Sequence, residues 1–199
     1  MKKIAALFAL ALTVLAGRPA IAAEAKSTVE TLDATLLDVM KNASALGYQG
    51  RYQKLAPVIE KTFDLPLMAQ ISVGPQWSSL TPDQQAKIVK SFTTLSVATY
   101  AARFDGYDGE TFQIVDAKPT GSDQLVNTKL VRPKDPAVDL NYRLRQSGGN
   151  WRIIDVFLSG TISQLANYRS EFSTTLRTKG ADGLVALIDQ KIAALQPKA

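Results

Sequence analysis

The sequence predicts an α+β fold in which a four-stranded antiparallel sheet packs against N-terminal and C-terminal helices. Apolar residues recur every three or four positions before residue 105 and again after residue 161, which is the period of a helix. Between residues 111 and 158, apolar and polar residues alternate instead, which is the period of a strand. Helices grouped before and after a run of strands are typical of the α+β class.

The first predicted helix covers residues 27–46. Its apolar residues follow helical spacing, and Ser27 with Glu30 has the pattern of a capping box at the start. Gly47 comes directly after the last apolar residue, where a glycine commonly ends a helix. These signals predict a helix bounded by Ser27 and Gly47.

Three more helices are predicted before the strands. Two are short, at residues 52–63 and 66–72, and the third is the longest, at residues 82–104. Thr81 and Gln84 have the spacing of a capping box at the start of this long helix. Its apolar stripe predicts that one face packs into the core.

The central part of the chain predicts four strands. The third alternates most clearly, with Val138, Leu140, Tyr142 and Leu144 on one face and polar residues on the other. The sequence Ser-Gly-Gly-Asn at 147–150 is a turn that joins the last two strands as a hairpin. The four expected strands are residues 111–118, 124–132, 137–146 and 151–158.

Two closing helices are expected at residues 162–179 and 183–195, separated at Gly180. The chain shows no internal repeat, low-complexity stretch or long linker that would divide it. Residues 23–199 are therefore expected to form a single domain with a sizeable core.

The N-terminus has the three-part pattern of a secretory signal peptide. Lys2 and Lys3 precede an apolar or small run at residues 4–16, and small residues lead to an expected cleavage after Ala22. The run is shorter than the roughly 20 residues that a membrane-spanning helix needs. We therefore expect residues 1–22 to be a cleaved signal and the mature protein to be exported, which lowers the formal charge from +5 to +2.

The composition excludes several kinds of active site. The sequence contains no histidine and no cysteine, so it cannot build a Ser-His-Asp triad, a Cys-His pair or a His-rich zinc site. An enzyme that relies only on carboxylates, lysine or tyrosine stays open, but we expect no enzyme activity, no metal and no cofactor. The small net positive charge also gives no reason to expect a nucleic-acid partner.

Asp155 is the one candidate catalytic residue, because it interrupts an apolar strand. One hypothesis makes it a general base in an apolar cavity, as some small α+β isomerases use. The other makes it half of a structural ion pair with Arg169, since buried charges survive mainly when they are paired. We favour the ion pair.

Two charged clusters have ordinary explanations. The acidic residues within 105–110 lack the spacing of a calcium-binding loop, so a turn between the long helix and the first strand is favoured. Four basic residues could form a docking face for lipid head groups, but the solvated side of a half-buried sheet is the favoured interpretation. These residues are Lys129, Arg143, Arg145 and Arg152.

Several motifs in this order resemble the MlaC family of periplasmic lipid-binding proteins, also called the toluene-tolerance family. The resemblance extends from Tyr52 to Leu195, and the stretch GGNWRIIDVFL at 148–158 is its strongest part. Two further segments, 73–77 and 160–166, resemble the HpnM branch, which is associated with hopanoid transport. Other matching segments include YQKLAPVI at 52–59, DLNYRLR at 139–145, YRSEF at 168–172 and KGADGL at 179–184.

The resemblance implies a twisted sheet, partly similar to NTF2-like folds, that packs with the helices around an apolar lipid cavity. It also implies a periplasmic shuttle between the outer and inner membranes that carries phospholipid or a hopanoid. The implied partners are an inner-membrane ABC transporter with an MCE-domain subunit and an outer-membrane lipoprotein complex. A small NTF2-like enzyme with Asp155 as its base and a cargo-free envelope adaptor are the alternative functions.

Large apolar side chains near the predicted sheet are the candidates for lining such a cavity. Periodicity alone cannot separate a filled core from a cavity lined by the same residues. The expected lipid-binding residues are Leu67, Met68, Ile71, Trp77, Phe92, Leu95, Phe104, Val126, Leu140, Tyr142, Leu144 and Phe157.

Overall fold

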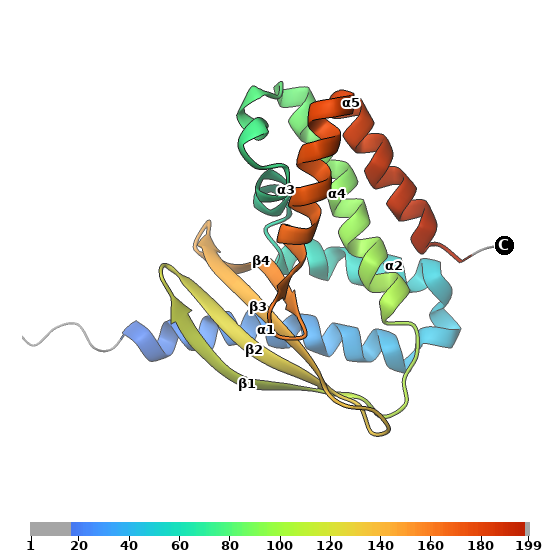
Figure 1. Ribbon diagram of the computed structural model, residues 1–199. Helices are drawn as coiled ribbons and strands as arrows, with labels where there is room; N and C mark the ends of the chain where they lie inside the picture. Colours follow the sequence, from blue (N-terminus) through green and yellow to red (C-terminus); the bar gives the residue numbers. More distant parts are fainter. Residues whose placement is uncertain (1–16, 198–199) are drawn as a thin grey trace, which may run out of the picture.

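The computed structural model describes residues 17–197, in which helices pack against one antiparallel sheet, so the predicted α+β class is confirmed (Figure 1). Residues 1–16 of the expected signal peptide lie outside this range. The first helix, α1, covers Gly17–Lys41 and so contains the expected cleavage point after Ala22. Within residues 17–197, no helix combines the length and the apolar character needed to cross a membrane.

The bounds predicted for the first helix are wrong. Helix α1 continues through Ser27, whose carbonyl accepts a hydrogen bond from the Thr31 hydroxyl at 2.9 Å. It ends instead before Asn42, whose side-chain amide donates back to the Asp38 carbonyl at 2.8 Å. Helix α2 follows at Ala43–Thr62. Its backbone is non-helical at Gly47, where φ is 56°, so the predicted break at Gly47 is present, although α1 has already ended before it. The cap signal at Ser27 was misleading because the residues before it also adopt a helix.

The long helix agrees well with its prediction. Helix α4 spans Pro82–Arg103, and both hydrogen bonds of the Thr81–Gln84 capping box are present, at 3.0 and 3.3 Å. It is preceded by α3 at Leu65–Val73 and by the 3₁₀ segment η1 at Gly74–Ser79. The clear cap explains why its start was predictable.

The sheet has five strands in sequential antiparallel order, rather than the four predicted. The additional strand, β5, contains only Ile162–Ser163 and pairs with the end of β4. Two residues are too few to show a period of two, so the sequence pattern could not indicate this strand. The other strands are β1 Thr111–Thr120, β2 Asp123–Val131, β3 Val138–Ser147 and β4 Asn150–Leu158.

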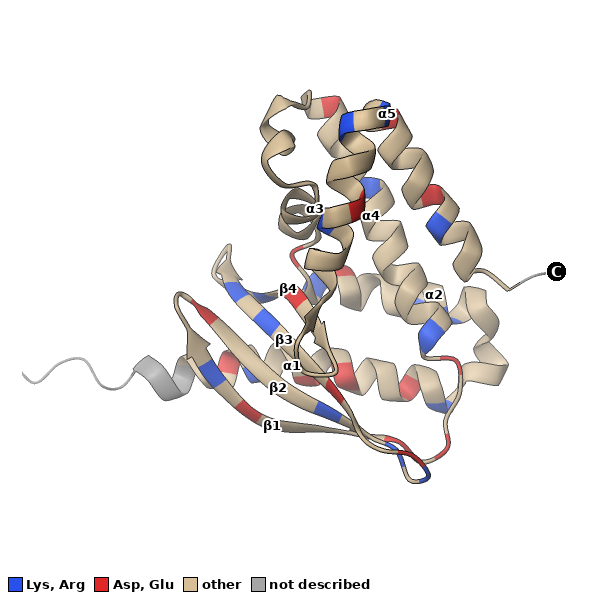
Figure 2. Ribbon diagram, in the orientation of Figure 1, with Lys and Arg blue, Asp and Glu red and all other residues tan. Residues whose placement is uncertain are grey.

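The two faces of the sheet differ sharply in polarity. Leu140, Tyr142 and Leu144 of β3 are buried on the inner face, as predicted. On the outer face, both Arg143 and Arg145 bind the carboxylate of Asp123. Figure 2 shows basic and acidic residues interspersed along the strands. This pairing agrees with the interpretation of the basic residues as a solvated sheet face.

Helix α1 lies along the inner face of the sheet (Figure 1). Val29, Leu32 and Leu36 on this helix are fully buried. The Thr28 hydroxyl also donates a hydrogen bond to the Trp151 carbonyl on β4 at 2.9 Å. This contact fixes the helix against the hairpin end of the sheet.

The remaining helices pack together at one end of the sheet (Figure 1). The last helix, α5, covers Gln164–Leu195 and reverses direction at Gly180, where φ is 69°. The predicted separation at Gly180 is therefore present as a sharp kink. Helices α4 and α5 pack against each other within this group.

Candidate functional site

A cavity of about 710 Å³ lies between the inner face of the sheet and the helices. Its volume falls within the roughly 300–1,000 Å³ typical of small-molecule sites. The sheet contributes Leu130, Val138, Leu140, Tyr142, Val156 and Leu158. The helices and the residues next to them contribute Met40, Phe63, Met68, Phe92, Tyr100 and Leu165 among others. The space is thus walled mainly by hydrocarbon and aromatic groups.

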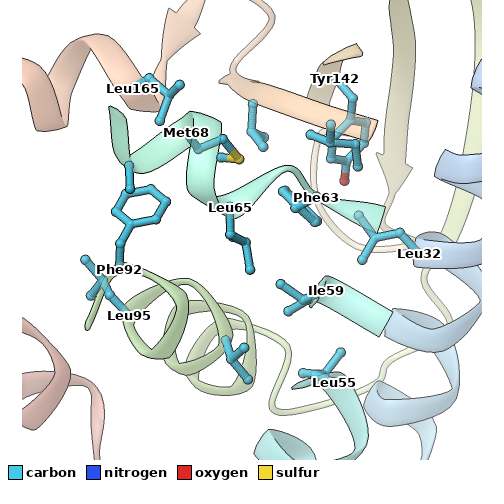
Figure 3. Close-up of a cluster of buried hydrophobic side chains, with 14 of the residues drawn as sticks. Leu32, Leu55, Ile59, Phe63, Leu65, Met68, Phe92, Leu95, Tyr142 and Leu165 are labelled. Atoms are coloured by element: carbon cyan, nitrogen blue, oxygen red, sulfur yellow. The ribbon is translucent and has the colours of Figure 1, made fainter. Parts of the chain in front are cut away.

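Aromatic side chains hold the helical side of this wall in place. Tyr100 stacks on Phe104 with ring centroids 5.6 Å apart and meets Phe63 edge-on at 5.7 Å. Phe92 packs edge-on against Tyr168 at 5.9 Å. Figure 3 shows Phe63, Met68 and Phe92 directed into the same apolar region. Met68 belongs to α3, Phe92 to α4, and Phe63 to the segment between α2 and α3. Such aromatic pairs contribute about 0.5–1.5 kcal/mol each beyond their burial.

Exposed charged residues mark the mouth of the cavity. Arg103 ends α4, and the following loop places Asp105 and Asp108 on the rim. Arg132, from the connection between β2 and β3, also lies on the rim and donates two hydrogen bonds to the Pro136 carbonyl. The mouth therefore presents both signs of charge to a polar group that stays near water.

Three polar side chains lie in the apolar interior. Tyr142 is fully buried, and its hydroxyl lies beside that of Tyr100. Asp33 of α1 is 5% exposed, and its Oδ1 atom lacks a hydrogen-bond partner within the described residues. Burial, with a smaller contribution from Glu30, raises the pKa of Asp33 to about 7. Burial also raises the pKa of Tyr100 and Tyr142, and each feels the charge of Asp33.

Five of the twelve predicted lipid-binding residues line the cavity. The five are Met68, Phe92, Phe104, Leu140 and Tyr142. Leu95, Val126 and Leu144 are buried in the core and lie outside the lining. Leu67, Ile71 and Trp77 are only partly buried, on α3 and η1, and also lie outside the lining.

Phe157 was placed on the wrong face of its strand. Val156 and Leu158 line the cavity, and successive side chains of a strand point to opposite faces, so Phe157 lies on the other side. The sequence of β4 is apolar at both sets of positions, so alternation gave no signal there. Leu158 was missed for the same reason.

The predicted ion pair between Asp155 and Arg169 is not formed among the described residues. Asp155 instead accepts hydrogen bonds from the Ser163 hydroxyl at 2.6 Å and from the Leu165 backbone N–H at 3.2 Å. Arg169 lies beside Gly74, where a Cβ atom would come within 3.0 Å of its Nε atom. Uncharged donors at the start of α5 therefore satisfy Asp155.

Asp155 does not line the cavity, so it is badly placed to act as a base on an apolar substrate. Asp33 is the buried carboxylate that sequence reasoning missed, because it sits next to the apolar stripe of a helix and belongs to no motif. Within residues 17–197, no group of three or more acidic side chains could hold a metal ion. The arrangement as a whole offers apolar volume with a polar rim, which suits binding.

Comparison with known proteins agrees with this geometry. The family model described as "MlaC protein" matches residues 30–190. A phospholipid-binding protein from Ralstonia solanacearum, solved in complex with a phospholipid, is 26% identical to the chain. The two structures superpose with a TM-score of 0.76, and the match covers 86% of this chain and 98% of the other.

Proposed function

Because the chain belongs to the MlaC family, we propose that it is a periplasmic lipid carrier that moves phospholipid or a hopanoid between the outer and inner membranes. The expected signal peptide at residues 1–22 supports export to that compartment. The similar protein from Ralstonia solanacearum binds a phospholipid. The single observation that carries the proposal is the apolar cavity of about 710 Å³ with a charged mouth.

The cavity matches the physical requirement for holding a lipid. Moving about sixteen methylene groups from water into an apolar site releases on the order of 13 kcal/mol, at about 0.8 kcal/mol each. Release of such a cargo into water is then too slow to be useful. Exchange with a membrane or a second apolar cavity involves almost no net transfer energy, so the carrier hands over its cargo by docking.

The expected docking partners follow from this requirement. An inner-membrane ABC transporter with an MCE-domain subunit is one proposed partner, and an outer-membrane lipoprotein complex is the other. Both would have to meet the protein at the mouth of the cavity, where Arg103 and the loop at 105–110 lie. The mixture of charges there fits a polar head group held near water.

The segments at 73–77 and 160–166, which resemble the HpnM branch, support a hopanoid as cargo. Gly74 and Gly160 within them adopt positive φ values of 79° and 77°. Neither glycine lines the cavity, but Gln164 and Leu165 of the second segment do. The proposal therefore includes two kinds of cargo, phospholipid and hopanoid, and chemical analysis of the bound lipid distinguishes them.

The alternative functions receive less support. An enzyme that uses Asp155 as its base would need that carboxylate in the cavity, and it lies outside the lining. A cargo-free adaptor would have no use for an apolar hollow of this size, because dry interior volume weakens a fold. The carrier accounts for the hollow directly.

Organic extraction of the purified protein, followed by mass spectrometry, tests the proposal. We expect a stoichiometric lipid, and its mass identifies phospholipid or hopanoid. The same purification applied to Phe92→Asp, which places a charge in the cavity wall, should yield little lipid. Val115→Asp is the matched control, because Val115 is 56% exposed on β1 and lies away from the cavity. Wild-type protein that carries no lipid in any preparation would contradict the proposal.

A further inference from the structure

One basic residue at the mouth of the cavity has no acidic partner. Arg103 ends α4 with an exposed side chain and belongs to the cavity lining. It forms no ion pair within residues 17–197. Arg132, the other basic residue of the lining, donates two hydrogen bonds to the Pro136 carbonyl and lies 3.9 Å from the Asp135 carboxylate. Arg103 is therefore the lining cation that is available to a ligand.

Arg103 lies where the charged mouth meets the apolar cavity. Thr99 and Tyr100, one turn earlier on α4, also line the cavity, and so does Tyr168 of α5. Helical residues three and four positions apart share a face, so Arg103 lies on the side of α4 that faces the cavity. Burial raises the pKa of Tyr168, and the positive charge of Arg103 partly opposes this change. A guanidinium in this position can contact the first polar group beyond the acyl chains of a lipid.

A carboxylate accompanies this guanidinium on the rim. Asp105 follows two residues later, is exposed and also lines the cavity. It pairs neither with Arg103 nor with any other basic residue in the described part of the chain. The other two acidic residues of the lining are engaged, since Asp108 lies 3.5 Å from Lys134 and Glu110 accepts from the Asp108 N–H at 2.6 Å. Figure 2 shows both signs of charge where α4 passes into the loop before β1.

We propose that Arg103 and Asp105 form a head-group site for a zwitterionic phospholipid, with Arg103 on the phosphodiester and Asp105 on a primary ammonium group. This inference rests on the proposed lipid-binding function and specifies its substrate class. A guanidinium binds a phosphate through two parallel hydrogen bonds, and a carboxylate accepts hydrogen bonds from an ammonium group. The cost of burying charge keeps this head group at the mouth while the acyl chains fill the cavity.

The balance of charges at the mouth favours a zwitterion over an anionic lipid. The lining contains two basic and three acidic residues, so an anionic head group would be attracted by Arg103 but repelled by the carboxylates. A zwitterion instead satisfies both free charges. Exposed ion pairs contribute little, so a direct pair between Arg103 and Asp105 would compete only weakly with a ligand.

Lipid uptake from vesicles by the purified protein tests the proposal. The vesicles contain phosphatidylethanolamine, phosphatidylglycerol and diacylglycerol, all with palmitoyl and oleoyl chains, so that only the head group differs. Mass spectrometry of the re-isolated protein gives the uptake of each lipid relative to its abundance in the vesicles. We expect the wild type to prefer phosphatidylethanolamine to phosphatidylglycerol by about threefold to fivefold, and both to diacylglycerol. Added salt should reduce these preferences, because it screens exposed charges.

The two residues should affect different ratios. Asp105→Asn should bring the ratio of phosphatidylethanolamine to phosphatidylglycerol close to one and keep the preference for both over diacylglycerol. Arg103→Gln should reduce the uptake of both phospholipids relative to diacylglycerol. Asp189→Asn and Arg177→Gln, at exposed positions of α5 outside the lining, are the charge-matched controls and should keep the wild-type ratios.

Several results would overturn the head-group site and leave the carrier intact. They are equal uptake of the two phospholipids by the wild type, a preference for phosphatidylglycerol, or wild-type ratios in either Arg103→Gln or Asp105→Asn. A protein that takes up no phospholipid but is purified with a hopanoid would overturn the site as well. Uptake of none of the three lipids, together with extracts free of lipid, would instead contradict the proposed function.

Discussion

The carboxylate of Asp155 on β4 accepts a hydrogen bond from the Ser163 hydroxyl at 2.6 Å, and this contact ties the end of the sheet to the start of α5. Ser163 is also the N-cap of α5, because its Oγ atom accepts from the Ala166 N–H at 3.0 Å. One aspartate therefore organises the turn that brings Leu165 against the cavity. The role is structural, although an apolar strand is also a suitable place for a catalytic base.

Asp155→Asn should lower the free energy of unfolding by about 1–3 kcal/mol, because it weakens charge-assisted hydrogen bonds to the start of α5. Urea denaturation measures the change. Ser170→Ala, at an exposed position of α5, is the control and should lie within about 0.5 kcal/mol of the wild type. Asp155→Asn should still carry lipid under conditions in which it is folded. An unchanged midpoint would show that these contacts do not stabilise the start of the helix.

Two aspartates that form ion pairs on the outer face of the sheet should differ in how much they stabilise the fold. Asp123 is 1% exposed and binds both Arg143 and Arg145, so Asp123→Asn should cost roughly 1.5–3 kcal/mol. Asp139 binds Lys129 at 2.6 Å in a pair that is about half exposed, so Asp139→Asn should cost below about 1 kcal/mol. Urea unfolding of the two variants compares them, and equal losses would be the contrary result.

The buried carboxyl group of Asp33 should make the fold less stable as pH rises. Its pKa changes from 3.8 in the unfolded chain to about 7 in the fold, so the folded state holds the proton more tightly. Stability is therefore lost between about pH 4 and pH 7, by at most about 4 kcal/mol at about 1.36 kcal/mol for each pKa unit. Urea unfolding of Asp33→Asn and of the wild type at pH 4 and pH 8 isolates this effect. The other titrating groups contribute equally to the free energy of unfolding of both proteins, so they cancel when the two are subtracted at each pH.

We expect Asp33→Asn to gain stability relative to the wild type on going from pH 4 to pH 8. The titration of Asp123 has the opposite sign. Burial opposes ionisation of Asp123, but hydrogen bonds from Arg145 and Arg143 overcome this and lower its pKa. Its contribution is therefore lost on acidification and is common to both proteins. A constant difference between wild type and variant across the range would refute the assignment to Asp33.

Filling the cavity should remove lipid without removing any core contact. Ser96 lines the cavity from α4, and its hydroxyl only donates to the Phe92 carbonyl within the same helix. Ser96→Trp should therefore reduce the lipid recovered per protein several-fold, because the indole ring occupies the space of the cargo. Ser44→Trp, at an exposed position of α2, controls for the added tryptophan. Mass spectrometry of extracts gives the ratio, and full occupancy of Ser96→Trp would show that the lipid lies elsewhere.

Features with a local cause could be predicted from the sequence. The cap at Thr81, the reversal at Gly180 and the alternation of β3 each depend on neighbouring residues, and all are present. The start of α1 and the two-residue β5 were missed. A cap signal does not prevent a helix from starting earlier, and two residues are too few to show a period.

The cavity residues show the same division. Alternation in β3 placed Leu140 and Tyr142 together on a buried face, and both line the cavity. In β4 every position from 153 to 158 except Asp155 is apolar, so the choice between Phe157 and Leu158 had no signal in the sequence. Register against β3 made that choice, since Leu158 pairs with Leu140.

The sequence by itself determined the class of fold, the absence of histidine and cysteine chemistry, and the motifs of a lipid-binding family. Only the tertiary structure decided that part of the apolar surface encloses space, which side chains face it, and that Asp33 is buried. The physical reason is that periodicity reports which face of an element avoids water. Whether such faces meet closely or leave a hollow depends on how distant elements pack.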